Sequence, residues 1–323
     1  MSTDREKVHF RSGDMQCAAW HYPSANGACV VMAGGFAVTK EPATDLFAAR
    51  FHAAGFGVLA FDYRRLGESG GQPRQIVRVG EQLADWAAAL GHAAALPGVA
   101  PQRIAVWGFS ASGGHIFRVA ARNARVAAAI AQTPNAGGPA AGRAATGYQK
   151  PAALLRTAGR GVADALGALV GRAPLLVPLG GEPGTVAVLT TPDVADAARA
   201  LQAERYPDWQ QQVAARSVLR LGVYQPGRDA ARVRCPLLVL VCDQDRSAYP
   251  PAAIAAAGRA PHAQLVRLPG GHYAPFLDAH EQAVAAQLAF LRRHLLEPDR
   301  AEHQPIGGSA QPSGRSGGSP DTP

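Results

Sequence analysis

Ser110 stands out in the segment Gly108-Phe109-Ser110-Ala111-Ser112, because the residues two before and two after it are small. The segment follows the apolar run Arg103–Trp107 and precedes a predicted helix. A strand, a tight turn and a helix in this order can lift a hydroxyl above the end of a sheet, provided that the residues two before and two after it are small. The pattern predicts Ser110 as a nucleophile at a helix N-terminus, which stabilises negative charge. Ser112 is the alternative, because Gly114 also gives it a small neighbour, and a structural turn without chemistry is the alternative to both.

A serine hydroxyl becomes a strong nucleophile only when a base takes its proton. His272 is the best candidate, because its loop follows the apolar run Ala263–Leu268 and precedes the last predicted helix. The two glycines before it, Gly270 and Gly271, give the loop freedom to aim the ring. His115 lies just inside the helix after the serine turn and is interpreted as a packing residue.

Two aspartates follow the apolar run Pro236–Cys242 and could orient this histidine. Asp245 has the loop position that reaches His272 better, whereas Asp243 lies nearer the strand end and is the alternative. A carboxylate there would fix the tautomer of His272 and stabilise its charged form.

Acyl chemistry also needs two N–H donors for the oxygen that becomes negative. The backbone N–H of Ala111, directly after the serine, is predicted to be one of them. The other is predicted to be that of Phe36, because Gly34 and Gly35 before it let the backbone approach a substrate carbonyl.

Strand-like apolar runs alternate with helical patterns on both sides of a long central segment. This alternation predicts an α/β fold with a mostly parallel central sheet flanked by helices, formed by residues 1–133 and 234–297. The predicted strands are Val8–Arg11, Cys17–Tyr22, Ala28–Ala33, Gly57–Phe61, Arg103–Trp107, Val126–Gln132, Pro236–Cys242 and Ala263–Leu268. The predicted helices are Leu46–Ala54, Ile76–Leu90, Ser112–Ala121, Ala252–Gly258 and a last helix that carries Val284, Leu288, Leu291 and Leu295 on one face.

Residues 134–233 are rich in Gly, Pro and Ala and show no clear buried strand, so we expect a helical lid inserted before the acid-bearing strand. Its predicted helices are Leu154–Val170, Asp193–Arg205 and Trp209–Leu221. Its apolar residues either pack the helices or line a site for a lipophilic ligand: Leu154, Leu155, Leu166, Leu169, Val170, Leu175 and Leu176. The Gly/Ser/Pro-rich segment 298–323 is expected to be disordered.

The net charge of +8 invites a nucleic-acid hypothesis, but the arginines are scattered and form no basic stripe with interleaved aromatics. None of the four cysteines has metal-ligand spacing, and no metal or organic cofactor is expected.

The charged N-terminus and the lack of a long apolar run favour a cytoplasmic protein with no nucleic-acid or membrane partner. The oligomeric state stays open, a homodimer included.

Four segments together resemble the α/β-hydrolase superfamily: AGGFAVTKE at 33–41, FDYRRLGESGG at 61–71, VWGFSASGGH at 106–115, and VCDQDRSAYP at 241–250 followed by PGGHYAPF at 269–276. The order Ser110, Asp245, His272 along the chain is that of this fold. The first segment departs from the family pattern, with Gly34 where a histidine often stands. Within the superfamily, the chain resembles S15-peptidase-like and polyketide-transferase-like proteins.

The resemblance implies a serine hydrolase for an ester or thioester of a lipophilic acyl or polyketide-like substrate, acting through an acyl-enzyme. A cyclase or acyltransferase of secondary metabolism with the same fold is the alternative, because fold and triad alone do not choose between these reactions. A basic nucleic-acid-binding protein is the remote alternative.

Overall fold

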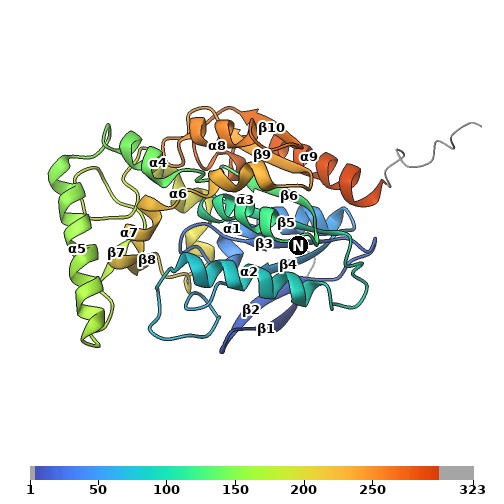
Figure 1. Ribbon diagram of the computed structural model, residues 1–323, viewed down its shortest axis with the longest axis horizontal. Helices are drawn as coiled ribbons and strands as arrows, with labels where there is room; N and C mark the ends of the chain where they lie inside the picture. Colours follow the sequence, from blue (N-terminus) through green and yellow to red (C-terminus); the bar gives the residue numbers. More distant parts are fainter. Residues whose placement is uncertain (1–3, 298–323) are drawn as a thin grey trace, which may run out of the picture.

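The computed structural model describes residues 4–297, which fold around one eight-stranded sheet (Figure 1). The sheet pairs β1 antiparallel with β2 and β2 antiparallel with β4, and all its other pairs are parallel. The predicted α/β fold with a mostly parallel sheet is therefore confirmed. In spatial order the strands are β1 (Glu6–Ser12), β2 (Met15–Tyr22), β4 (Gly57–Phe61), β3 (Cys29–Ala33), β5 (Ile104–Phe109), β6 (Val126–Gln132), β9 (Leu237–Cys242) and β10 (Ala263–Leu268).

The central strands are apolar without interruption because helices cover both faces of the sheet. Along β3, Val30 and Met32 point into one core, and Val31 between them points into the other. Helices α1 (Lys40–Ala53) and α9 (His280–Leu291) cover the first face. The second face is covered by α2 (Val79–Ala93), α3 (Ala111–Arg122) and α8 (Pro250–Ala257).

Residues 134–233, here called the insertion, run between β6 and β9 and lie at one end of the molecule (Figure 1). Their main elements are α4 (Gly138–Ala145), α5 (Pro151–Leu169), β7 (Leu176–Pro178), α6 (Val194–Ala200), β8 (Gln212–Ala214) and α7 (Ala215–Val223). The single helix predicted for Trp209–Leu221 is confirmed only in its second half, where α7 begins at Ala215; the three residues before α7 form the strand β8. That strand pairs with β7 over three residues, a long-range contact that a local helical pattern does not reveal.

Helix α5 buries a face of small side chains, among them Ala153 and Thr157, and packs against α7. The helices approach so closely that a Cβ at Gly161 would lie 2.9 Å from Cγ of Leu219. The larger apolar side chains of α5 consequently face outward. Most of the leucines that the sequence predicted to pack the helices or to line a ligand site are therefore exposed. We call the exposed row the α5 stripe: Leu155, Val162, Leu166 and Leu169, with exposed fractions of 73%, 50%, 60% and 81%.

Within residues 4–297, no helix is both long and apolar enough to cross a membrane. The predicted disordered segment 298–323 lies outside the described residues.

Candidate active site

Ser110 lies at the turn from β5 to α3 with φ 56° and ψ −114°, a conformation that L residues rarely adopt. Such a backbone costs on the order of 1–3 kcal/mol, so the surrounding structure must impose it. Gly108 makes the turn possible, because a Cβ there would lie 2.5 Å from the carbonyl oxygen of Ser112. The sequence pattern of small residues thus reflects a steric requirement of this turn.

Ser110, His272 and Asp245 form one chain of hydrogen bonds. Ser110 Oγ lies 2.9 Å from His272 Nε2, and His272 Nδ1 lies 2.7 Å from Asp245 Oδ2. The other carboxylate oxygen of Asp245 accepts the backbone N–H groups of Ser247 and Ala248, each at 2.8 Å. These bonds hold the carboxylate in a fixed orientation, so that it can fix the tautomer of the histidine.

The alternative residues have other contacts. Asp243 forms a surface ion pair with Arg267 at 2.8 Å. Ser112 is 1% exposed, and its hydroxyl lies 2.6 Å from the Tyr63 hydroxyl and donates to the carbonyl of Gly34. The structure therefore places neither Asp243 nor Ser112 in the hydrogen-bonded chain.

The second histidine near the serine turn, His115, is enclosed in the core. Its two ring nitrogens lie 2.9 Å from the Tyr224 hydroxyl and 2.9 Å from Oε1 of Gln82. Burial, aided by the charge of Arg118, lowers the pKa of His115 to about 3. This side chain stays neutral at physiological pH and packs between helices, as the sequence predicts.

Asp193, contributed by the insertion, is a site residue that the sequence did not reveal. Its Oδ1 accepts the backbone N–H of His272 at 3.2 Å. Its Oδ2 accepts the N–H of Arg246 at 2.8 Å and the hydroxyl of Ser247 at 2.9 Å. One carboxylate thus joins the loop of His272 to the loop of Asp245. A Cβ at Gly271 would lie 2.4 Å from Asp193 Oδ1. A larger residue at position 271 would therefore displace the Asp193 carboxylate, in addition to restricting the loop.

Two carboxylates act on the imidazole of His272. Burial by itself would lower the pKa of His272, but the charge and hydrogen bond of Asp245, with a smaller contribution from the charge of Asp193, outweigh it. The pKa is raised above its ordinary value of 6.5 as a result. The site therefore favours the imidazolium, the form that a base reaches after taking a proton.

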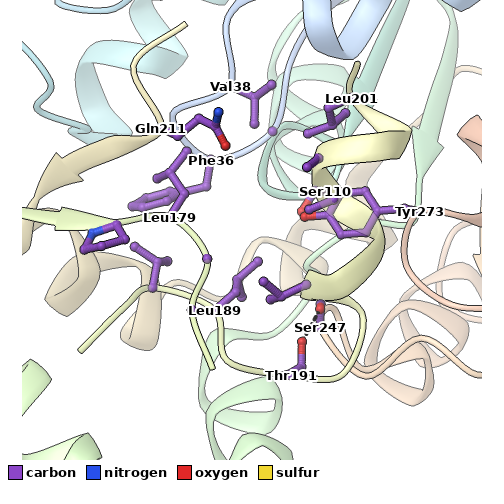
Figure 2. A pocket seen from close by; sticks show the side chains of 18 of the residues that line it. Phe36, Val38, Ser110, Leu179, Leu189, Thr191, Leu201, Gln211, Ser247 and Tyr273 are labelled. Atoms are coloured by element: carbon purple, nitrogen blue, oxygen red, sulfur yellow. Dashed lines mark hydrogen bonds between the residues drawn. The ribbon is translucent and has the colours of Figure 1, made fainter. Parts of the chain in front are cut away.

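An apolar pocket of about 670 Å³ opens in front of Ser110 (Figure 2). Figure 2 shows Phe36, Leu179, Leu189 and Leu201 arranged around the cavity, with Ser110 beside it. The insertion supplies most of its walls: Leu179, Val188, Leu189, Val194, Leu201, Trp209 and Leu221. These are not the leucines that the sequence suggested.

Phe36 and Ala111, the predicted oxyanion donors, line the same pocket as Ser110. Among the described residues, no protein acceptor is hydrogen-bonded to the backbone N–H of either one. Neither amide is thus bound to a partner in the described part of the chain.

A buried ion pair anchors the loop that carries Phe36. Asp62, directly after β4, accepts the backbone N–H of Lys40 at 2.8 Å and contacts its ammonium at 2.9 Å. Both side chains are 0% exposed, and the ammonium also lies 2.7 Å from Glu68 and 2.9 Å from Glu41. The FDYRRLGESGG segment thus fixes the position of the predicted oxyanion loop.

Known proteins are similar to this chain along most of its length. A family model described as "Alpha/beta hydrolase family" matches residues 29–287. The quorum-quenching protein AidA of Acinetobacter baumannii is 36% identical over 88% of this chain and 94% of its own. The polyketide transferase ATR5 of Stachybotrys chlorohalonatus is 34% identical over 56% of this chain and 58% of its own. The crystal structure of the alpha/beta hydrolase GrgF from a Penicillium species superposes with a TM-score of 0.75 at 23% identity, covering 90% of this chain and 99% of its own.

Proposed function

The chain belongs to the alpha/beta hydrolase family, and we propose that it is a serine hydrolase for an ester or thioester of a lipophilic acyl or polyketide-like substrate. The observation that supports this most is the hydrogen-bonded chain from Ser110 through His272 to Asp245, at the edge of an apolar pocket. Nucleophile, base and orienting acid are within hydrogen-bond reach of one another, as nucleophilic catalysis requires.

In this proposal, Ser110 Oγ attacks the carbonyl carbon of the substrate while His272 Nε2 takes the hydroxyl proton. The N–H groups of Phe36 and Ala111 bind the oxygen that becomes negative. As the tetrahedral intermediate collapses, His272 returns the proton to the leaving alcohol or thiol, and an acyl-serine remains. A water molecule then gives a proton to His272 and attacks the acyl carbon. As this second intermediate collapses, His272 returns that proton to Ser110 Oγ and the carboxylic acid is released.

The pocket supports a lipophilic acyl group. Its walls are mainly apolar, and their burial of an alkyl chain would contribute about 0.8 kcal/mol for each methylene. One polar group stands out in the lining: Oδ1 of Asn135 is buried without a hydrogen-bond partner among the described residues. We propose that this oxygen accepts a hydrogen bond from a donor on the substrate.

A hydrolysis assay tests the proposed reaction. The panel contains p-nitrophenyl esters and acyl thioesters of increasing chain length, and an N-acyl lactone, because a signal molecule is a candidate substrate for a relative of a quorum-quenching protein. We expect turnover that rises with chain length and falls by about 10⁴-fold or more in Ser110→Ala. Near-full activity of Ser110→Ala on the best substrate would contradict an acyl-enzyme mechanism.

Acyl transfer is the second candidate, supported by the similarity to a polyketide transferase and by the apolar pocket. Transfer and hydrolysis share the acyl-serine and differ only in whether an alcohol, a thiol or water attacks it. Adding a lipophilic alcohol to the assay separates them, because a transferase forms a new ester while a hydrolase continues to release the acid.

A further inference from the structure

A second hollow, which we call the arginine groove, lies on the other side of α7 from the Ser110 pocket. Leu221 of α7 lines the Ser110 pocket, whereas Leu219 and Val223 of the same helix line the groove. The groove has a volume of about 870 Å³ and lies between α5, α7 and the start of α2. No Asp or Glu is among the described residues that line the groove. Five arginines line it: Arg78, Arg118, Arg216, Arg220 and Arg228.

The positive charge of the groove is only partly neutralised. Three of its arginines have a carboxylate partner: Arg78 with Glu81, Arg118 with Asp229, and Arg216 with Asp164. The side chains of Arg220 and Arg228 are exposed and have no ion pair or hydrogen bond with the described part of the chain. Nη2 of Arg216 is buried and has no hydrogen-bond acceptor there either. The exposed guanidinium groups of Arg220 and Arg228 are therefore the donors that the groove offers to an anion.

The rim of the groove is apolar and continues onto the α5 stripe. Leu169 and Val223 both line the groove, with exposed fractions of 81% and 66%. From Leu169 the stripe runs back along α5, the helix that lies farthest from the sheet in Figure 1. Exposed apolar rows beside concentrated charge are typical of binding surfaces for amphiphilic partners.

We propose that the arginine groove is a second binding site, which takes the phosphate of an anionic amphiphile and places its alkyl chain along the α5 stripe. The forked guanidinium groups match the oxygens of a phosphate. The apolar rim would contact an alkyl chain, which an inorganic phosphate ion lacks. A second copy of this chain fits less well, because pairing the stripe with itself would supply no anion for Arg220 and Arg228.

Calorimetric titration with two soluble probes tests the site in the full-length protein at low ionic strength. The probes are inorganic phosphate and dihexanoylphosphatidic acid below its micelle concentration. We expect the phosphatidic acid to bind about tenfold or more tightly than phosphate, because its chains bury apolar surface. Equal affinities would overturn the role of the stripe, and no binding of either probe would overturn the site.

Two sets of variants separate the charge from the apolar surface, and all their side chains are exposed, so folding is retained. The double variant Arg220→Glu/Arg228→Glu should lose about tenfold or more in affinity for both probes. Leu169→Ser/Val223→Ser should keep the affinity for phosphate and lose the gain from the chains. Arg292→Glu/Arg293→Glu changes two exposed residues just beyond α9, at the other end of the molecule; it is the matched charge control and should bind as the wild type does.

The source of the amphiphile is tested with vesicles. Sedimentation with vesicles that contain phosphatidylglycerol, but not with phosphatidylcholine alone, would identify a lipid surface as the source. It would also overturn the sequence-based expectation of no membrane partner. Binding of the monomeric probe without sedimentation would identify a soluble phosphate ester. If a short single-stranded DNA bound as tightly as the phosphatidic acid, the groove would be a general polyanion surface and the proposal would be wrong.

Discussion

Two buried carboxylates follow strand ends of the same sheet and serve different purposes. Asp62 follows β4 and contacts the ammonium of Lys40 at 2.9 Å, whereas Asp245 follows β9 and contacts the imidazole of His272 at 2.7 Å. Burial acts to lower the pKa of Lys40, but Asp62 and Glu41 outweigh it, so its pKa is raised and the ammonium stays charged. Against the effect of burial, Asp245 raises the pKa of His272 above its ordinary value of 6.5, but an imidazole, unlike the Lys40 ammonium, can still take and return a proton during a reaction.

The difference lies in the partner of each carboxylate. A carboxylate with a permanent cation holds a loop in place, whereas one with a titratable partner can support proton transfer. The first pair should therefore affect mainly stability and the second mainly catalysis, and four substitutions can break or sharpen this distinction.

The largest effect is expected from Asp245→Asn. The amide can still bond to the imidazole but favours the wrong tautomer, so kcat should fall by about 10³–10⁴-fold with little loss of stability. Steady-state kinetics on the best ester measures this change. Asp243→Asn, two residues away on the surface, is the matched control and should keep its activity, because exposed ion pairs contribute little. Equal losses in the two variants would contradict the assignment of Asp245.

The next largest effect is expected from Lys40→Met. Removing the ammonium leaves Asp62 buried without its cation, which should lower the free energy of unfolding by about 3–5 kcal/mol. Urea denaturation measures this change. Lys40→Met/Asp62→Asn should recover part of the loss, since no buried charge at position 62 is then left unpaired. Unchanged stability of Lys40→Met would show that the comparison between the two pairs is wrong.

A smaller effect is expected from Asp193→Asn. Loss of this negative charge removes part of what raises the pKa of His272, so the pKa should move down. Because the neutral imidazole is the base, activity falls as pH decreases through this pKa, and the acid limb of kcat/KM should move to lower pH. Stability should fall by about 1–2 kcal/mol, because an amide cannot accept as many of the three hydrogen bonds. If the acid limb of the kcat/KM profile stayed in place while stability fell, Asp193 would have a purely structural role and the predicted effect on the pKa of His272 would be wrong.

The smallest effect is expected from Ser112→Ala. This change removes one buried hydroxyl that bonds to Tyr63 and to the Gly34 carbonyl, at a cost of about 1 kcal/mol in stability. Turnover should stay within about threefold of the wild type, because Ser112 does not contact His272. A loss comparable with that of Ser110→Ala would move the nucleophile to Ser112.

Local patterns were sufficient for much of this molecule. Apolar runs predicted the central strands because a buried parallel strand is largely apolar, and the bounds of β4 and β6 agree with the prediction. The bounds of β10 agree as well, although this edge strand is largely exposed. The serine turn was predictable because its steric requirement lies within five residues. Chain order and loop position favoured His272 and Asp245 over the other candidates, and the structure brings these two side chains within hydrogen-bond distance.

Contacts between distant segments were beyond such patterns. Asp193 meets the loops of Asp245 and His272 only in the folded chain, so nothing adjacent to it in the sequence indicates its contacts. The strand β8 exists because β7 pairs with it. The leucines of α5 were expected to be covered, but the close packing of Gly161 on α7 turns the stripe outward.

Labelling with a fluorophosphonate probe tests most directly whether Ser110 is an activated nucleophile. The labelled peptide is identified by mass spectrometry in the wild type, in His272→Ala and in Ser112→Ala. We expect label on Ser110 in the wild type and in Ser112→Ala, and loss of that label in His272→Ala. Absence of label from folded wild-type protein that turns over an ester, or label that persists without His272, would contradict the assignment of Ser110 as an activated nucleophile.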